Sequence, residues 1–288
     1  MNISKLFEKK KTVYSFEIFP PKKQSSIDTV YDTLEALGDL SPDYISVTYG
    51  AGGSARENKT AELAERIKNK LKIEPLAHLS CVNSTKSEID TILENLKALH
   101  VQNILALRGD IVPDGNIPGD FRYACDLIRY IRERGDFNIA AACYPEKHLE
   151  AASLDEDIQR LKEKTDLGVG HLITQLFFDN NHFYDFMDKL RQKGITTPVT
   201  AGIMPITSAG QTEKMVNMCG AGIPAACRKM IERYGDDPVA MRDAGIIYAT
   251  NQIMDLIANG VDGIHIYTMN NPYVARKITL SIGSLLHD

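Results

Sequence analysis

The sequence predicts a single (β/α)8 barrel of the TIM type, and three observations support this prediction. Short apolar runs rich in β-branched and aromatic residues alternate with longer stretches of helical periodicity along the chain. The runs recur about every 30 residues, the length of a βαβ unit whose right-handed crossover makes its strands parallel. No Pro/Gly-rich hinge, low-complexity linker or charge shift divides the chain, so we predict one domain over residues 1–288.

Eight runs qualify as strands. They are residues 12–20, 44–50, 74–80, 103–109, 138–145, 171–178, 198–205 and 263–270. The last interval is longer than the others, and it predicts extra helices between the seventh and eighth strands. We expect these helices over residues 208–219, around 223–234, and over 238–258.

The segments between the strands carry apolar stripes with the spacing of a helix that covers a sheet. The two clearest stripes are Ile27, Val30, Tyr31, Leu34 and Leu37, and Ile89, Ile92, Leu93, Leu96 and Leu99. Two helix starts also carry the pattern of a capping box, in which a hydroxyl and a carboxylate satisfy free amides. These are Thr85 with Glu88, and Ser153 with Glu156.

Composition excludes several classes of function. The chain has 33 Lys and Arg against 38 Asp and Glu, a net charge of −5, so no basic surface for nucleic acid or anionic membrane is expected. The lysine-rich first residues lack an apolar leader, and no stretch is long enough to span a membrane. We therefore expect a cytoplasmic protein. The five cysteines form no CxxC pair, which predicts reduced and mostly buried thiols.

Polar residues cluster at the ends of the predicted strands. In a (β/α)8 barrel these ends build the active site. The candidates are Glu17, Thr48, Tyr49, His78, Arg108, Asp110, Tyr144, His148, Gln175 and Tyr267. Glu17 interrupts an apolar run, so we expect burial to raise its pKa toward the range of a proton donor. The alternative is a structural Glu17 paired with an arginine that braces the barrel.

Other sites are less consistent with the sequence. His78 and His148 show no HxxxH or HxH spacing, so we expect no metal site. No G-x-S-x-G elbow is present. Residues 50–55 match a G-x-G-x-x-A dinucleotide fingerprint, but the only acid in the following strand, Glu74, stands at its start, which argues against a Rossmann fold.

The motifs, in this order, resemble those of methylenetetrahydrofolate reductases over about residues 12–285. They are Ser15-Phe16-Glu17-Ile18-Phe19-Pro20-Pro21, Ser46-Val47-Thr48-Tyr49-Gly50-Ala51, Ala77-His78-Leu79-Ser80-Cys81, Ala106-Leu107-Arg108-Gly109-Asp110, Ala142-Cys143-Tyr144-Pro145-Glu146-Lys147-His148, Thr174-Gln175-Leu176-Phe177-Phe178-Asp179 and Tyr267-Thr268-Met269-Asn270. The resemblance implies an α/β barrel that holds FAD.

The resemblance also implies roles for individual residues. Glu17 would be the general acid that opens the folate ring to an iminium cation, and the charge of Asp110, facing flavin and folate, would favour that cation. Gln175, Gln211 and Tyr267 would contact the folate or the nicotinamide donor. Residues at positions resembling the FAD site are Thr48, Tyr49, Ala51, His78, Arg108, Gly109, Asp110, Tyr123, Ala124, Tyr144, His148, Asp157 and Lys164. Gln211 has a second explanation, because Ser208 and Gln211 also form a capping-box pattern.

Two departures concern substrate binding. Met215 stands where some relatives present an aromatic residue to the nicotinamide donor, and Asn271 stands where many carry an arginine for the folate tail. The chain stops at the barrel, without the regulatory region of eukaryotic relatives, so feedback by adenosylmethionine is not expected.

The predicted function is FAD-dependent reduction of 5,10-methylenetetrahydrofolate to 5-methyltetrahydrofolate with NADH or NADPH, in two half-reactions at one face. A homo-oligomer is expected. One alternative is another flavin barrel, such as a proline dehydrogenase-like oxidase, although Arg276 is the only arginine near strand eight for a carboxylate. The other is a folate- or flavin-binding subunit that receives electrons from a partner protein.

Overall fold

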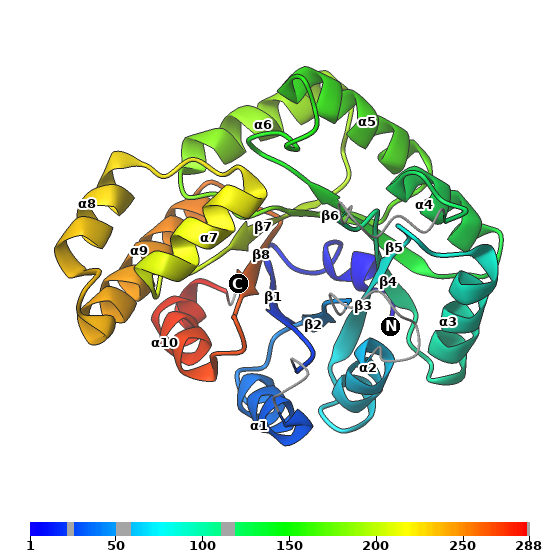
Figure 1. The fold of residues 1–288 in the computed structure, drawn as a ribbon, viewed down its shortest axis with the longest axis horizontal. Helices are drawn as coiled ribbons and strands as arrows, with labels where there is room; N and C mark the ends of the chain where they lie inside the picture. The colour runs from blue at the N-terminus through cyan, green and yellow to red at the C-terminus, as the bar shows by residue number, and fades with distance from the viewer. Residues whose placement is uncertain (22–25, 50–58, 111–118, 287–288) are drawn as a thin grey trace.

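The chain forms a closed barrel of parallel strands surrounded by helices (Figure 1). A computed structural model describes residues 1–21, 26–49, 59–110 and 119–286. Within these residues eight strands pair in chain order, and β1 closes the barrel against β8. This confirms the predicted (β/α)8 barrel and excludes the open sheet of a Rossmann fold. The glycine-rich residues 50–55, which suggested a dinucleotide fingerprint, lie outside the described residues.

All eight predicted strands are present. They are β1 Val13–Ile18, β2 Tyr44–Val47, β3 Glu74–Ser80, β4 Asn103–Leu107, β5 Asn138–Cys143, β6 His171–Thr174, β7 Val199–Ile203 and β8 Gly263–Tyr267. Most are shorter at the carboxyl end than the apolar runs predicted. The chain leaves the ladder there and turns, and the polar residues of interest follow in the turns.

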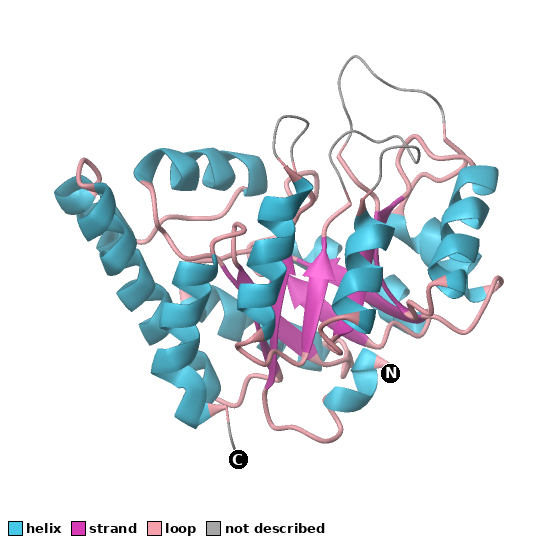
Figure 2. Ribbon diagram, turned by 90° about the horizontal axis from the view of Figure 1, so that it is seen from below, coloured by secondary structure: helices cyan, strands magenta, loops and turns pink. Residues whose placement is uncertain are grey.

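The helices lie outside the sheet, with the additional helices α7, α8 and α9 gathered on one side (Figure 1, Figure 2). They are η1 Ile3–Leu6, α1 Ile27–Gly38, α2 Thr60–Asn69, α3 Lys86–Ala98, α4 Ala124–Arg132, α5 Leu154–Asp166, α6 Asn180–Gln192, α7 Ala209–Cys219, α8 Ala225–Tyr234, α9 Pro238–Ala258, α10 Pro272–Ile282 and η3 Gly283–Leu285. The three helices expected between the last two strands are therefore confirmed, each within two residues.

Two of the three predicted capping residues make the expected side-chain hydrogen bond at the start of their helix. Thr85 and Glu88 form a reciprocal capping box at α3. Ser153 Oγ accepts from the Glu156 amide at α5, while the Glu156 carboxylate accepts from Ala152, one residue before the expected amide. At α7 the Ser208 side chain makes no capping hydrogen bond, so the capping explanation for Gln211 is wrong.

The main core lies between the outer face of the sheet and the helices. A smaller apolar cluster fills the amino-terminal half of the barrel interior, where Ile3 and Leu6 of η1 pack against Tyr44, Leu76 and Leu105. Helix η1 thus closes the lower end of the barrel, which leaves the carboxyl ends of the strands as the open face. The five cysteines are free thiols, and Cys81, Cys143 and Cys227 are buried, as expected.

Candidate active site

Glu17 lies at the centre of a polar cluster inside the upper barrel. Its carboxylate Oε2 is 3.4 Å from His78 Nε2 and 3.6 Å from His265 Nε2, and the Ser46 hydroxyl donates to it at 3.4 Å. These side chains come from β1, β3, β8 and β2, and each is at least mostly buried. The main chain is also held, because Thr268 Oγ1 donates to the Glu17 carbonyl at 2.6 Å.

The expected rise in the pKa of Glu17 is wrong. Burial alone would raise this pKa, but hydrogen bonding to His265 and Ser46 and the charge of the neighbouring imidazoles outweigh it, and the pKa lies below its ordinary value. Burial lowers the pKa of His78 to about 4, so His78 is neutral near pH 7. The apolar residues beside Glu17 in sequence point away from it, because successive strand residues face opposite sides. The bracing explanation also fails, because the partners of Glu17 are histidines and a serine rather than an arginine.

His265 is fixed from both ring nitrogens. Ser15 Oγ lies 2.7 Å from Nδ1, and Ser46 Oγ lies 3.3 Å from Nε2. Ser15 also donates to the Ile264 carbonyl at 3.3 Å. Because a serine hydroxyl both donates and accepts, either tautomer of His265 can be hydrogen-bonded in this setting. His265 Nε2 lies beyond hydrogen-bond distance of the Glu17 carboxylate, but the Ser46 hydroxyl contacts both groups.

Tyr267 crosses the mouth of the barrel from β8 toward β6. Its hydroxyl donates to the Thr174 carbonyl at 2.6 Å, directly before Gln175. The ring fits because β7 presents Gly202 beneath it: a Cβ there would lie 2.7 Å from Tyr267 Cε2. Burial raises the pKa of Tyr267, so the phenol stays protonated. Tyr267 is the register partner of Glu17 between β8 and β1, and Gln175 directly follows β6, so both stand at the carboxyl ends of their strands, and their contact with a substrate stays a prediction. The Gln175 side chain accepts from the Leu176 amide, which fixes its oxygen.

Arg108 stands at the end of β4 on the neighbouring side of the opening. Its Nη1 and Nη2 each donate at 2.6 Å to the two oxygens of Glu150, and its Nε donates to the Gly109 carbonyl at 3.2 Å. Gly109 has φ of +89°, and a Cβ on it would lie 2.8 Å from Val82. Glycine is therefore required where Arg108 leaves the strand.

The loop after β5 joins the other predicted cofactor residues. Asp157 accepts from the His148 amide at 2.8 Å, and His148 Nδ1 accepts from the Glu150 amide at 3.1 Å. The Tyr144 ring packs edge-on against His148 with centroids 4.9 Å apart. Lys164 Nζ donates to the Ala142 carbonyl, and burial lowers its pKa although Asp157 opposes this. Asp157 and Lys164 thus face β5 and the loop after it rather than solvent, and their contact with a cofactor stays a prediction.

The remaining predicted residues lie around these two groups. Asp110 is exposed beyond Arg108, and its charge acts on Tyr144 and Cys219. The Thr48 carbonyl accepts from Thr60 at 2.8 Å. Tyr49 packs partly buried against the core. Tyr123 is the N-cap of α4 and is 42% exposed, and Ala124 is the first residue of that helix. Gln211 is half-buried in the first turn of α7. Ala51 lies outside the described residues.

Met215 and Asn271, the two residues that depart from the family pattern, have structural roles of their own. Met215 packs against the apolar cluster beneath α7. Asn271 is the N-cap of α10, where its side chain accepts from the Val274 amide at 3.2 Å. Arg276 points to Asp39 at 3.7 Å on the outside, which removes the arginine that a proline dehydrogenase-like site would need.

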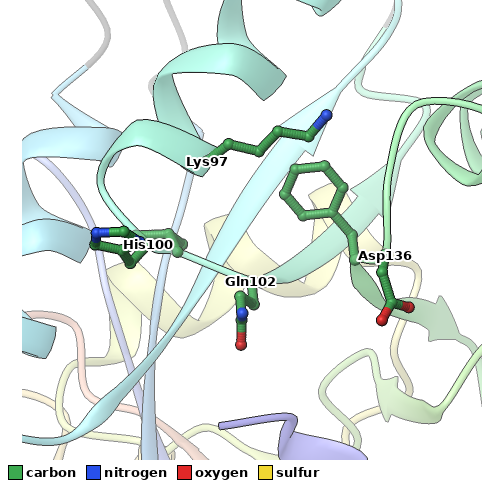
Figure 3. Close-up of a pocket in the computed structure, with 6 residues that line it drawn as sticks. Lys97, His100, Gln102 and Asp136 are labelled. Atoms are coloured by element: carbon green, nitrogen blue, oxygen red, sulfur yellow. The ribbon is translucent and has the colours of Figure 1, made fainter.

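A separate cavity of about 120 Å³ does not belong to this site (Figure 3). It is lined by Lys97, His100, Val101, Gln102, Asp136 and Phe137. Gln102 and Phe137 directly precede β4 and β5, so the cavity opens at the amino-terminal face. Among the described residues no three His, Cys, Asp or Glu side chains gather as metal ligands.

Sequence reasoning missed three residues of the site. Ser46 and His265 sit inside strands rather than at their ends, although the alternation in β8 places His265 on the same side as Gly263 and Tyr267. Glu150 lies in a loop two residues after His148. Only the pairing of β4 with β5 brings Glu150 to Arg108, so no local signal would have identified it.

The fold and site describe a (β/α)8 barrel protein with a buried acid–histidine cluster and a rim that carries both acidic and basic side chains at one face. Residues 2–283 match the family profile of methylenetetrahydrofolate reductase. The 5,10-methylenetetrahydrofolate reductase of Escherichia coli strain K12 is 34% identical over 269 residues, which cover 93% of this chain and 90% of the relative. The chain belongs to the methylenetetrahydrofolate reductase family.

Other relatives are longer. Methylenetetrahydrofolate reductase (NADH) 1 of Arabidopsis thaliana is 35% identical over 297 residues, covering 98% of this chain and 50% of the relative. The chain spans about half the length of this and the other plant relatives it matches. An uncharacterised protein from Clostridium thermocellum, solved with two copies of 5-methyl-5,6,7,8-tetrahydrofolic acid, has a TM-score of 0.67 at 13% identity over 99% of both chains, which shows the fold alone. None of the described helices has the length and apolar character needed to cross a bilayer.

Proposed function

We propose that this protein reduces 5,10-methylenetetrahydrofolate to 5-methyltetrahydrofolate, using FAD as the hydride carrier and NADH or NADPH as the donor. The carrying observation is the placement of Glu17 in reach of His265 and beside the opening bordered by Tyr267 and Gln175. Membership of the family supports the folate substrate. Bound FAD would supply the hydride chemistry, whereas the protein supplies orientation, a proton and charge.

The donor set of the rim fits a flavin dinucleotide. Beside the hydrogen bonds to Glu150, one further N–H on each Nη of Arg108 has no acceptor among the described residues, and guanidinium forks suit phosphate. Tyr144 and His148 offer ring faces and edges, and Lys164 and Asp157 offer a cation and a carboxylate on the same side. These residues would hold the cofactor at this rim.

Proton delivery follows from the hydrogen bonds around Glu17. Its lowered pKa keeps the isolated carboxyl ionised near pH 7, so a proton donated to the folate nitrogen must come through a neighbour. His265 is that neighbour, with Nε2 at 3.6 Å and the Ser46 hydroxyl in contact with both groups. The carboxylate of Asp110, on the exposed rim, would favour the cation formed when the ring opens.

The first test is the absorption spectrum of the purified protein. We expect a yellow flavoprotein whose colour is bleached by NADH or NADPH without any partner protein and restored by methylenetetrahydrofolate. A flavin that neither nucleotide reduces, but that a partner reductase does reduce, would favour the electron-accepting subunit. A colourless preparation that takes up no added FAD would contradict the proposal. Homo-oligomerisation stays a prediction that light scattering tests.

Replacing Glu17 by Gln separates the two half-reactions. Gln keeps the shape but neither gains nor loses a proton, so flavin reduction by the nicotinamide donor should stay within about twofold, while reoxidation by methylenetetrahydrofolate slows by about 10²- to 10⁴-fold. Stopped-flow absorbance measures both rates. An equal loss in both half-reactions would remove Glu17 from the role of proton donor.

A further inference from the structure

The Arg108–Glu150 ion pair occupies the part of the site that the proposed function assigns to an anion. Both guanidinium Nη atoms point at the two carboxylate oxygens, each 2.6 Å away, in the bidentate geometry that arginine also forms with phosphate. The Arg108 side chain is 19% exposed and that of Glu150 is 57% exposed. The Arg108 guanidinium is therefore mostly covered by the protein, whereas the Glu150 carboxylate reaches it from the solvent side.

Glu150 is brought to Arg108 by the loop that carries other predicted cofactor residues. Its amide donates to the His148 ring, and the His148 amide in turn donates to Asp157. The loop also turns sharply at Lys147, which has φ of +74°, and the Lys147 side chain donates to the Ala151 carbonyl at 2.9 Å. These contacts hold the backbone of the loop. None of them uses the Glu150 carboxylate, which is free to leave Arg108 without disturbing the loop.

We propose that Glu150 is an internal competitor for the diphosphate group of the cofactor at Arg108. The inference rests on the proposed function, since it concerns the same rim. While paired, Glu150 neutralises the charge of Arg108 and takes the N–H groups best placed for an anion. Phosphate oxygens and the carboxylate cannot share those N–H groups, and their like charges repel. We expect the diphosphate to take those N–H groups, rather than the outer two that Glu150 leaves, and so to displace the carboxylate into solvent.

The pair has the features of a displaceable contact. An exposed carboxylate regains its hydration when it swings out, so breaking such a pair costs little free energy. A structural brace would bury both partners, as the Glu17 cluster does. Glu150 would thus set an upper limit on cofactor affinity and make release easier. The opposite possibility is that Glu150 orients Arg108 for the phosphate, and this predicts an effect of opposite sign.

The test compares the wild-type holoprotein with Glu150→Gln. Dilution releases FAD, and the rise in flavin fluorescence gives the dissociation constant. Gln removes the charge and the second acceptor oxygen, so we expect FAD to bind about three- to tenfold more tightly. Glu156→Gln is the matched control: Glu156 pairs with Arg160 at the start of α5, and this variant makes the same charge change without contacting Arg108. It should retain wild-type affinity.

A second arm isolates the phosphate contact. ADP should bind more tightly to Glu150→Gln than to the wild type by isothermal titration, whereas adenosine should bind both equally. Unchanged or weaker FAD binding by Glu150→Gln, with a wild-type melting temperature, would overturn the inference and leave the flavin function intact. Tighter binding that Glu156→Gln reproduces would also overturn it, because net charge alone would then explain the gain. A wild-type protein that binds no FAD would instead refute the proposed function.

Discussion

The behaviour of Glu17 is decided by residues that are far from it in sequence. Between Phe16 and Ile18 it occupies an apolar run, yet its carboxylate faces Ser46, His78 and His265 inside the barrel. An apolar surrounding would have raised its pKa, and the actual surrounding lowers it. In the proposed proton delivery, Glu17 acts as a pair with His265 and not as an isolated acid.

Replacing His265 by Gln tests this pairing. We expect the folate half-reaction to slow by about ten- to a hundredfold, since the carboxylate loses its proton source. The pKa of Glu17 should rise, since an imidazole hydrogen bond and its charge are lost, so the pH profile of that half-reaction should move to higher pH. Stopped-flow reoxidation of the flavin between pH 5 and 8 measures both changes.

His182→Gln is the control for this variant. His182 lies 3.1 Å from Glu146 in a half-exposed pair outside the Glu17 cluster. Its replacement should leave the rate and the pH profile of the folate half-reaction unchanged. Equal profiles for wild type and His265→Gln would show that Glu17 receives its proton from elsewhere.

At the scale of elements, β6, β7 and β8 are joined at the mouth of the barrel by Tyr267. The phenol reaches across Gly202 to the Thr174 carbonyl, and the Gly202 amide donates to Thr174 Oγ1 at 2.9 Å. A Cβ on Gly202 would lie 2.4 Å from the Thr174 carbonyl oxygen. Since that oxygen belongs to the backbone of a barrel strand, it cannot move aside cheaply.

Gly202→Ala should therefore displace Tyr267 and destabilise the barrel by at least about 2 kcal/mol. Urea denaturation followed by circular dichroism gives the free energy of unfolding. Gly210→Ala, on α7, is the control, because a Cβ there meets nothing within 4 Å. It should be neutral or stabilising by about 0.5–1 kcal/mol. Equal stability of the two variants would mean that the barrel can accommodate a Cβ at position 202 and that the packing of Tyr267 does not require glycine there.

At the scale of the whole molecule, the apolar cluster in the lower half of the barrel also encloses a buried histidine, His171. His171 is fully buried there, and neither of its ring nitrogens has a hydrogen-bond partner among the described residues. The rings of His171 and Tyr44 meet edge to face with centroids 5.9 Å apart. Burial lowers the pKa of His171 from 6.5 to about 3, so the folded protein keeps it neutral.

This burial predicts a loss of stability in acid. The unfolded chain takes up a proton on His171 below pH 6.5 whereas the folded chain does so only near pH 3, so the contribution is fully present above pH 6.5 and is lost as the pH falls. At pH 4 the loss from His171 alone reaches about 3 kcal/mol. His171→Leu should remove it, and at pH 7 its free energy of unfolding should equal or exceed that of the wild type by about 1–2 kcal/mol.

Urea denaturation of both proteins at pH 7 and pH 4 measures the difference. The wild type should lose more stability between the two pH values than His171→Leu. Parallel losses would show that other groups carry the acid dependence. His78 is one such group, since burial lowers its pKa to about 4, and it remains present in both proteins.

Local patterns were sufficient for the strands and most helices. The apolar runs place every strand, and helix α9 Pro238–Ala258 has the predicted bounds, because Asp237 accepts from the first amides and Pro238 follows it. The strand ends also indicated Glu17, Arg108 and Tyr267 as site residues, since barrel topology sends those ends to one face. The partners of Glu17 and Arg108 could not be predicted in this way.

The strands and helices of the barrel thus follow from the chain's own periodicity, because burial of alternating and helical apolar faces depends on near neighbours. Tertiary contacts decided the state of each ionisable group. Whether Glu17 is proton donor or carboxylate depends on His265, 248 positions away by their numbers (265 − 17), and whether Arg108 is available depends on Glu150. Coulomb energy and desolvation act through space, and only closure of the barrel sets those distances.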